Sequence, residues 1–479
     1  MKHALQKRHI RAAAGMMAAC ITALSVTARP VNQAFAANGP VIIGYRGDIN
    51  NDMKIDRTDV LLLVSYLLGN SADISEEKFN RLANADLDNS NSLNASDLTL
   101  LKRVALGITP PTPIYADVFR IAPEIAADMW LGWNLGNTME AYEAADCDKI
   151  TYQWIPSVGS NNPSDYETCW GAPVTTQEMI DGVKAAGFNT VRIPVFWGNM
   201  MANDGTWTIN ADYIGRVKEI VDYCMNDGLY AVINIHHFDE FIIRRNNLAN
   251  CSDIFERLWT QIAESFRDYP DTLVFEGFNE YLGGKQFNEW GELKEPSQDD
   301  AYLLTNTLNQ TFVNAVRAAG GSNAERVLII SGYCTNIDNT TSGRFRVPND
   351  TVSDRLMVSV HYVDNLMYWI NQIGSRSWAE YTDSQIALLD QAFKSKGIPV
   401  FVGETTSRYP ESSFAAGAEY KGSSQCLEIV LNKLTEHGYV PVLWDVTDNF
   451  YSRDTCTIKD SEDAKVISEL SARLHSVSG

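Results

Sequence analysis

The chain lacks an excess of positive charge, paired cysteine motifs and long apolar runs, and each absence argues against a class of protein. Its 479 residues include 39 Lys and Arg against 60 Asp and Glu, so the net charge is −21 and nucleic acid is disfavoured as a partner. No two Cys have the C-x-x-C spacing typical of zinc sites. Beyond the N-terminal region no apolar run is long enough to span a bilayer, which argues against a membrane protein.

The first 36 residues predict a secretory signal peptide. A basic start precedes a mostly apolar stretch at 12–28 and a small-residue cleavage site at 34–36. Cys20 follows two Ala and leaves a lipoprotein signal as the alternative. We therefore expect a secreted, extracellular protein. Export permits disulfides, but the sequence assigns no pairs. The Cys that remain after cleavage are residues 147, 169, 224, 251, 334, 426 and 456.

Two acidic segments of twelve residues, 48–59 and 86–97, repeat one pattern. Oxygen-bearing side chains stand at positions 1, 3, 5, 9 and 12, and position 7 can add its backbone carbonyl, which is the spacing that wraps oxygen ligands around Ca²⁺. Each segment runs into an apolar helical stretch that ends in Gly. One segment alone could be an acidic turn, but two in the same register predict two structural Ca²⁺ sites. The predicted ligands are Asp48, Asn50, Asp52, Asp56, Asp59, Asp86, Asp88, Ser90, Asn94 and Asp97.

Position 6 of each loop, where Gly is usual, is Met53 in the first and Asn91 in the second. Met tolerates a left-handed backbone less well than Asn, which leaves the affinity of the first site open. The repeat over residues 44–108 resembles a type I dockerin. The resemblance implies a small all-α module that binds two Ca²⁺ and docks onto a cohesin of a cellulosomal scaffold. The Pro- and Thr-rich segment 109–116 is expected to be a stiff linker.

Residues 117–479 predict a (β/α)8 barrel. Short runs that are apolar on both faces alternate with helical stretches, as expected for parallel strands covered by helices. Eight such units favour a barrel, and the absence of a Gly-rich phosphate loop speaks against the alternative, a doubly wound open sheet. The predicted strands are 131–135, 190–194, 230–235, 273–278, 326–331, 356–360, 399–402 and 439–443. The predicted helices are about 175–186, 210–226, 252–267, 300–319, 383–396 and 426–437.

Polar side chains gather within or just after these predicted strands. In a barrel the C-terminal ends of all strands share one face, where barrel enzymes build their sites. Glu280 and Glu404 stand out, because two carboxyl groups that meet in a cleft can break a glycosidic bond. Any one of the others could be an ordinary core residue, so the prediction depends on the set. Its members are Asn137, Arg192, His236, His237, Asn279, Glu280, Tyr333, His361, Tyr362, Glu404 and Trp444.

Together with the segments 131–138, 167–171, 191–194 and 234–237, this set resembles glycoside hydrolase family 5, in its branch of bacterial endoglucanases and xyloglucanases. The resemblance implies a retaining reaction without a cofactor, with Glu280 as acid and base and Glu404 as nucleophile. It further implies that Arg192 keeps Glu404 ionised and that Asn279 binds the sugar 2-hydroxyl. The three His would order the site and bind hydroxyls, and Trp444 would stack under a sugar ring.

One position departs from the pattern of that family. The family usually places a Tyr two residues after the His that corresponds to His361, where it bonds the nucleophile, but here the position holds Val363. Tyr362 comes one residue earlier, and because side chains alternate along a strand it is expected to point away from Glu404. Either the backbone is bulged, or another group such as Tyr333 takes the role.

The sequence thus predicts a secreted endo-β-1,4-glucanase acting on cellulose, mixed-linkage glucan or xyloglucan. A β-mannanase with the same mechanism is the nearest alternative. A barrel that binds carbohydrate without catalysis is a second alternative, and the presence of both Glu280 and Glu404 argues against it.

Overall fold

The computed structural model describes most of the chain. The predicted signal peptide, the predicted ligand Ser90, Asn91 of the second loop and Cys147 lie outside the described residues. The described residues are 42–69, 85–88, 92–115, 119–142, 160–202, 204–237, 248–280, 286–287, 293–294, 297–363, 368–447 and 449–478.

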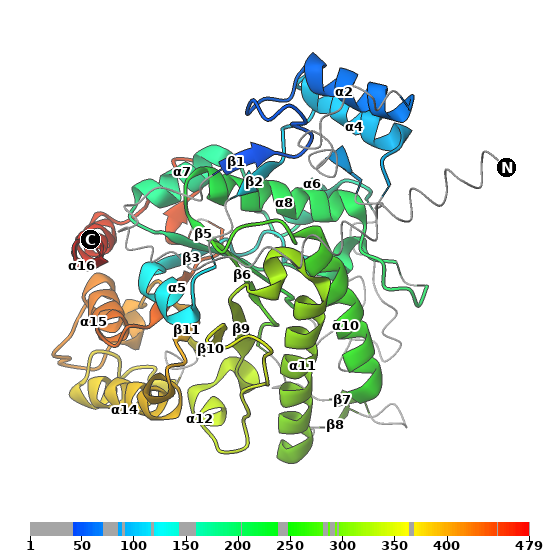
Figure 1. Cartoon of the computed structure of the whole chain (residues 1–479). Helices are drawn as coiled ribbons and strands as arrows, with labels where there is room; N and C mark the ends of the chain where they lie inside the picture. The colour runs from blue at the N-terminus through cyan, green and yellow to red at the C-terminus, as the bar shows by residue number, and fades with distance from the viewer. Residues whose placement is uncertain are drawn as a thin grey trace. The chain divides into compact units, whose positions relative to one another are not determined.

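Eight parallel strands close into a barrel, which confirms the predicted fold (Figure 1). Every predicted strand is present, with ends that shift by a few residues. Around the barrel the order is β10-β11-β12-β3-β4-β5-β6-β9, the order of the chain. The strands are β3 (Gly132–Asn134), β4 (Thr190–Ile193), β5 (Tyr230–Asn234), β6 (Leu273–Glu276), β9 (Leu328–Ser331), β10 (Leu356–Tyr362), β11 (Val400–Thr406) and β12 (Val440–Trp444).

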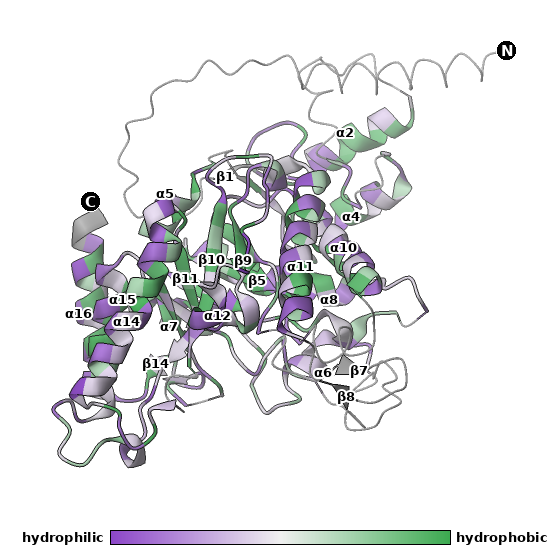
Figure 2. Ribbon diagram, turned by 90° about the horizontal axis from the view of Figure 1, so that it is seen from below, coloured by the Kyte–Doolittle hydropathy of each residue, from purple (hydrophilic) through white to green (hydrophobic). Residues whose placement is uncertain are grey.

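Helices surround the strands, and their apolar residues form the main core with the outward faces of the barrel (Figure 2). In α10, for example, the buried Cys251, Phe255, Leu258 and Ile262 recur at helical spacing. The six predicted helices appear as α7 (Gln177–Ala185), α8 (Ala211–Asn226), α10 (Leu248–Ser265), α11 (Gln298–Ala319), α14 (Arg376–Ala392) and α15 (Ser423–Glu436). Helices that were not predicted are α5 (Ala122–Asp128), α6 (Pro163–Glu167), α12 (Ile337–Thr340) and α16 (Ser461–Ser478).

The interior of the barrel is layered, and the layers decide where a site can form. At the N-terminal end Ile125 and Met129, from and just after α5, pack with the inward residues Val232 and Val274 in a buried apolar cluster. Because side chains alternate along each strand, the next inward positions on β5, β6 and β10 are Asn234, Glu276 and Ser359. The apolar plug closes one end, so the polar layer above it faces the C-terminal mouth.

The described residues of the N-terminal module include two helices, α2 (Arg57–Leu67) and α4 (Ala95–Ala105). These pack around a small core of their own that includes Leu63 and Leu101. A short antiparallel sheet adds β1 (Ile42–Tyr45) and β2 (Pro113–Tyr115). The segment predicted as a linker therefore includes a strand that pairs with residues preceding the first acidic loop, and the module is not purely helical. The backbone amide of Arg46 extends the pairing by donating to the carbonyl of Thr112.

Among the helices that the structure describes, none combines the length and the apolar character needed to cross a bilayer.

Candidate active site and calcium loops

The guanidinium of Arg192 is the centre of the polar layer. Arg192 lies on β4 with no exposed surface and donates hydrogen bonds in four directions. Its Nε bonds Glu276 at 2.7 Å, its Nη1 bonds Asn134 and Glu404 at 2.9 Å each, and its Nη2 bonds Asn279 at 2.8 Å. A planar fork with this many partners fixes both the nucleophile candidate Glu404 and the amide of Asn279.

Glu276 belongs to this network, and sequence reasoning missed it as a site residue. Its carboxylate is fully buried and accepts from Arg192, from Asn234 Nδ2 at 3.0 Å and from Ser359 Oγ at 2.7 Å. The signal was a charged residue in the middle of a buried strand, since an isolated buried carboxylate is too costly to occur without a partner. Arg192 thus carries one positive charge between two carboxylates.

A bulge turns Glu404 into the barrel. The pairing of β11 with both neighbours slips by one residue, so that Val402 pairs with Val360 but Glu404 pairs with His361. The extra residue is Gly403, where an added Cβ would lie 3.1 Å from the imidazole of His361 and 3.2 Å from the carboxylate of Glu276. Any larger residue here would press on the side chains of the polar layer beneath Glu404, so glycine fits the position best. The bulge lies in β11, not in β10 where the sequence suggested it.

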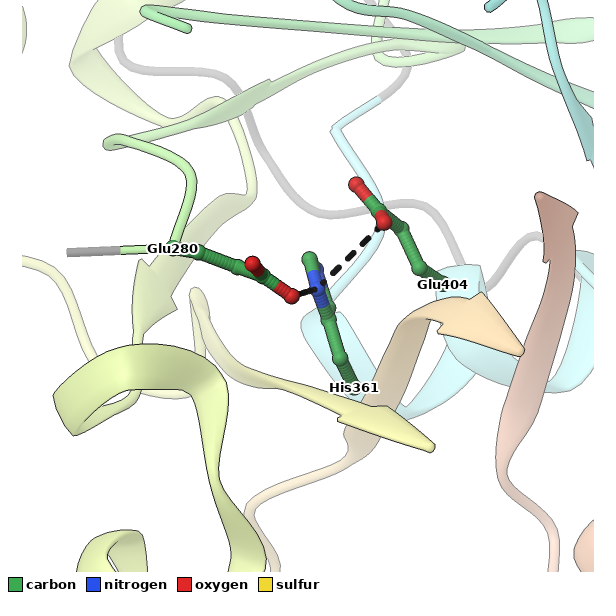
Figure 3. Close-up of side chains that lie close together, drawn as sticks. All are labelled: Glu280, His361 and Glu404. Carbon is green, nitrogen blue, oxygen red and sulfur yellow. Dashed lines mark hydrogen bonds and ion pairs between the residues drawn. The ribbon is translucent and has the colours of Figure 1, made fainter. Parts of the chain in front are cut away.

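Glu280, His361 and Glu404 meet at the mouth (Figure 3). His361 Nδ1 lies 2.8 Å from Glu280 Oε1 and 3.7 Å from Glu404 Oε2, and one ligand atom of each residue falls within 4.8 Å of the other two. The Glu280 side chain is 48% exposed, whereas Glu404 and His361 are buried. Among the predicted site residues, these three and Arg192 converge most closely.

The charges of this cluster set the directions of its pKa values. Burial raises the pKa of Glu404 above that of an ordinary carboxyl group, against the opposing effects of His361 and Arg192. Burial would also raise the pKa of Glu280, but the hydrogen bond and charge of His361 hold it below the usual range. Burial lowers the pKa of His361, and the two carboxylates overcome this and raise it. The two carboxylates thus stabilise the protonated form of His361 that lies between them.

Aromatic rings line the mouth over β5 and β12. Trp444 ends β12 and its ring lies parallel to that of His236, with centroids 6.3 Å apart. His236 meets His237 edge to face, and His237 in turn contacts Tyr142 and Trp170. Burial and the neighbouring His237 hold the pKa of His236 well below the usual value, so its imidazole is neutral. These predicted residues do share one rim of the barrel.

Of the two asparagines predicted for the site, Asn279 joins the hydrogen-bond network of Arg192 and Asn137 does not. Asn279 reaches the network, and since its Oδ1 accepts from Arg192, its NH₂ group is the part left to donate. Asn137 instead forms a left-handed turn after β3, with φ of 57°, where its backbone amide bonds Glu140. Asn134, not Asn137, supplies the β3 side chain of the polar layer. Its Oδ1 accepts from Arg192 while its Nδ2 donates to the carbonyls of Gly403 and Leu443.

Neither predicted tyrosine supports Glu404. Tyr362 points out of the barrel, where its hydroxyl bonds Thr382 on α14, and Tyr333 packs edge to face on Tyr302. The reason for Tyr362 is strand alternation: His361 faces inward, so its neighbour faces outward. Within the part of the chain that the structure describes, Arg192 is the hydrogen-bond donor to Glu404 and no tyrosine hydroxyl takes the role. Tyr362 therefore does not bond the nucleophile candidate, while a role for Tyr333 in binding substrate stays a prediction.

The acidic loops of the N-terminal module repeat in structure as well as in sequence. In the first, Asp59 accepts from the backbone amides of Ile49 and Asp56, and in the second, Asp97 accepts from those of Leu87 and Asn94. Carboxylate oxygens of Asp86, Asp88 and Asp97 lie within 4.8 Å of one another, a donor set that suits a hard cation. Three of the ligands predicted for Ca²⁺ in the second loop, Asp86, Asp88 and Asp97, therefore fit the ion.

Two details modify the predicted ligand sets. Asp56 and Asn94 cap the helices α2 and α4, accepting from the amides of Thr58 and Ser96. The only side-chain oxygen of Asn94 is thus engaged in the cap, which suits contact with an ion through water. In the first loop Met53 adopts the left-handed conformation with φ of 67°, as position 6 requires. Asp48 there accepts from the backbone amides of Asp52 and Met53.

A closed parallel barrel with two carboxylates, a histidine and an arginine at its C-terminal mouth defines a (β/α)8 glycoside hydrolase. A family model for cellulases of glycosyl hydrolase family 5 matches residues 151–450, and a model for the dockerin type I domain matches residues 46–106. The chain belongs to glycosyl hydrolase family 5 and carries a dockerin type I domain, as its sequence predicted.

Similar proteins agree with this assignment. Endoglucanase A of Clostridium longisporum is 37% identical over 322 residues, which is 65% of this chain and 58% of that protein. Endoglucanase A of Paenibacillus barcinonensis is 32% identical over 357 residues, 68% of this chain and 82% of that protein. A solved broad-specificity endoglucanase from an uncultured bovine rumen ciliate is 30% identical with a TM-score of 0.62, over 74% of this chain and 99% of that one.

Proposed function

We propose that the protein is a secreted endo-β-1,4-glucanase that hydrolyses plant cell-wall β-glucans with retention at the anomeric carbon. The observation that carries this proposal is the convergence of Glu280 and Glu404 on His361, with their nearest ligand atoms within 4.8 Å. Inverting glycosidases need carboxyl groups about 6.5–9.5 Å apart to admit a water, whereas retaining ones hold them about 5–5.5 Å apart. The short spacing supports double displacement.

In the first step a carboxylate oxygen of Glu404 bonds to the anomeric carbon as the glycosidic C–O bond breaks. Glu280 gives its proton to the departing oxygen. In the second step Glu280 takes a proton from water, whose oxygen bonds to the anomeric carbon while the bond to Glu404 breaks. One water is consumed and both carboxyl groups return to their first state.

The electrostatics support this division of roles once substrate is present. The Glu280 side chain is 48% exposed, so a sugar chain that covers it removes water and raises its pKa, which favours the protonated form that a general acid needs. When Glu404 becomes an ester its negative charge disappears, and the pKa of Glu280 falls again as a base requires. Arg192 favours the ionised form of Glu404. The NH₂ group of Asn279 is left to donate a hydrogen bond to a sugar hydroxyl.

The net charge and the relatives support the proposed class of substrate. A chain with net charge −21 is better suited to a neutral polymer than to an anionic one. A relative from Bacteroides ovatus, 30% identical, is named a xyloglucan-specific endo-β-1,4-glucanase, and a similar solved endoglucanase from Ruminococcus champanellensis holds cellotriose. Reducing-sugar release from pure polysaccharides tests the proposal. We expect activity on cellulose, mixed-linkage glucan or xyloglucan, and activity on mannan alone would contradict it.

We further propose that the dockerin type I domain binds two structural Ca²⁺ and attaches the enzyme to a cohesin of an extracellular cellulosome. The converging carboxylates of the second loop support the ion, and they hold the loop that precedes α4. Native electrophoresis with a type I cohesin tests this. We expect a complex in Ca²⁺ that is lost on adding a chelator, and a complex that survives the chelator would contradict the Ca²⁺ role.

Replacing Met53 by Gly is expected to raise the Ca²⁺ affinity of the first loop about fivefold. The left-handed backbone at this position costs a residue with a Cβ on the order of 1 kcal/mol, which Gly does not incur. Calorimetric titration of the whole protein measures the effect. Met53→Ala is the matched control, because it removes the same 44%-exposed side chain but keeps the Cβ. An equal gain from Ala would show that backbone strain is not the cause.

A further inference from the structure

The segment 277–280, which ends in Glu280, departs from the strand that precedes it. Pairing of β6 with β9 ends at Glu276. Glu276 and Asn279 both bond Arg192, although alternation along a strand would place residues three apart on opposite sides. The backbone between them must therefore turn, and the position of Glu280 depends on the groups that hold this turn.

A single hydroxyl bonds both backbone groups of Phe278, in the middle of the turn. Ser331 Oγ, on β9, accepts from the backbone amide of Phe278 at 3.0 Å and donates to the carbonyl of the same residue. The backbone amides on either side of Phe278 bond the carbonyls of Ile329 and Ile235, at 2.9 and 3.1 Å. Ser331 and Phe278 are both buried, and buried backbone groups are costly to leave without a partner, so the hydroxyl fixes this peptide firmly.

Ser331 is itself fixed by a helix. Asn309, fully buried on α11, accepts from the backbone amide of Ser331 at 3.0 Å and donates to its carbonyl at 2.9 Å. From α10, which packs beside α11 (Figure 1), the indole N–H of Trp259 donates to the carbonyl of Gly277 at 3.0 Å. The two helices thus hold the turn through side-chain hydrogen bonds.

The turned segment directs its side chains to opposite sides. Phe278 packs edge to face on Phe255 of α10, with centroids 5.9 Å apart, whereas Asn279 bonds Arg192 inside the barrel. Glu280 comes next, at the mouth. A shift or rotation of the peptide at Phe278 would therefore move the carboxyl group of Glu280.

We infer that Ser331, held by Asn309, is a positioning residue that sets where the carboxyl group of Glu280 stands relative to the leaving oxygen. The inference rests on the proposed function, in which Glu280 protonates that oxygen. A proton donor must lie within about 2.6–3.2 Å of the atom that it protonates, and a misplacement of about 1 Å can lower the rate about 100-fold. Ser331 therefore affects the cleavage of bonds that need an acid and spares bonds that do not.

Two substrates that differ in their need for an acid test the inference. Cellotetraose has a sugar leaving group that must be protonated, whereas 2,4-dinitrophenyl β-cellobioside releases a phenolate that departs without a proton. Ser331→Ala is expected to lower kcat/KM on cellotetraose about tenfold or more and to leave kcat/KM on the dinitrophenyl substrate within about twofold. Loss of stability alone reduces the amount of active enzyme and lowers both values equally, so the ratio of the two values separates a misplaced acid from a less stable fold.

Two further variants on α11 complete the experiment. Asn309→Leu keeps the hydroxyl of Ser331 but removes both bonds that fix it, and we expect the ratio to fall about threefold or more. This variant keeps the test informative if Ser331→Ala does not fold. Thr305→Val is the matched control, because it removes a buried hydroxyl one turn away that bonds only the helix carbonyl of Ala301, and the ratio should not change.

The outcomes separate the inference from the proposed function. An unchanged ratio in Ser331→Ala, or equal losses on the two substrates, overturns the inference, and the same result in Asn309→Leu overturns the part assigned to Asn309. Glu280→Ala is expected to lower the ratio about 100-fold or more. If it does not, or if the unaltered enzyme cleaves neither substrate, the proposed function itself has failed.

Discussion

Glu404→Ala is expected to lower kcat on β-glucan about 10,000-fold or more, because it removes the carboxylate that we propose bonds to the anomeric carbon. The Glu404 side chain is held in a fixed position. A bulge at Gly403 turns it inward, and Arg192 Nη1 bonds one of its oxygens at 2.9 Å. Glu276 cannot replace it, since that carboxylate lies beneath it in the polar layer with both oxygens engaged. Binding of cello-oligosaccharides should persist, because Trp444 and the aromatic rim are untouched.

Adding azide tests whether the lost activity of Glu404→Ala is due to loss of the nucleophile. If Glu404 is the nucleophile of a retaining site, azide can occupy the space left by the carboxylate and attack the same face, so azide should restore turnover and form an α-glycosyl azide. Glu411→Ala is the control, since this exposed carboxylate follows the same strand. Unchanged turnover in Glu404→Ala would contradict the assignment. Formation of the α-glycosyl azide by Glu280→Ala and not by Glu404→Ala would reverse the two roles.

The sequence was sufficient for the barrel because its strands are apolar on both faces and each is followed by a helix or a long loop. Runs such as 230–235 and 273–278 could not be solvent-facing, and eight of them close a barrel. The two glutamates and Arg192 were predictable as a group, since residues at the C-terminal ends of parallel strands must share one face. Their meeting at the mouth follows from topology.

The rest of the site depends on details of the backbone, such as strand register and bulges, that cannot be predicted from the residue types. Glu276 and Asn134 end β6 and β3 but lie inside the longer apolar runs predicted as strands. A polar residue there looks like an exception within a core until the inward layer is known. The bulge at Gly403 changes which side of β11 faces inward, and it could not be placed without the pairing of neighbouring strands. The same holds for β1 and β2, which are far apart in the chain and pair across the dockerin domain.

Two variants of the Arg192–Glu276 pair are expected to shift the pKa of Glu404 in opposite directions. Burial raises the pKa of Glu404, and Arg192 opposes this with a charge that it shares with Glu276. Glu276→Gln removes the competing anion, so the whole charge of Arg192 acts on Glu404 and its pKa falls. The Gln amide can donate to Ser359, whose hydroxyl then accepts, so the layer stays bonded. The double variant Arg192→Gln/Glu276→Gln removes the cation with its buried partner, and the pKa of Glu404 rises.

The acid limb of the kcat/KM profile reports this pKa in the free enzyme, since the nucleophile must be ionised. We expect the limb to move down by about 1 pH unit in Glu276→Gln and up by about 1 unit or more in the double variant. We also expect kcat to fall about 100- to 1,000-fold in the double variant, because Arg192 orients both Glu404 and Asn279. Arg192→Gln alone would leave two buried carboxylates without their cation, at a cost of about 3–5 kcal/mol, so the charge-balanced double variant is the cleaner test. Limbs that move in the same direction, or not at all, would mean that Arg192 positions the site without setting the ionisation of Glu404.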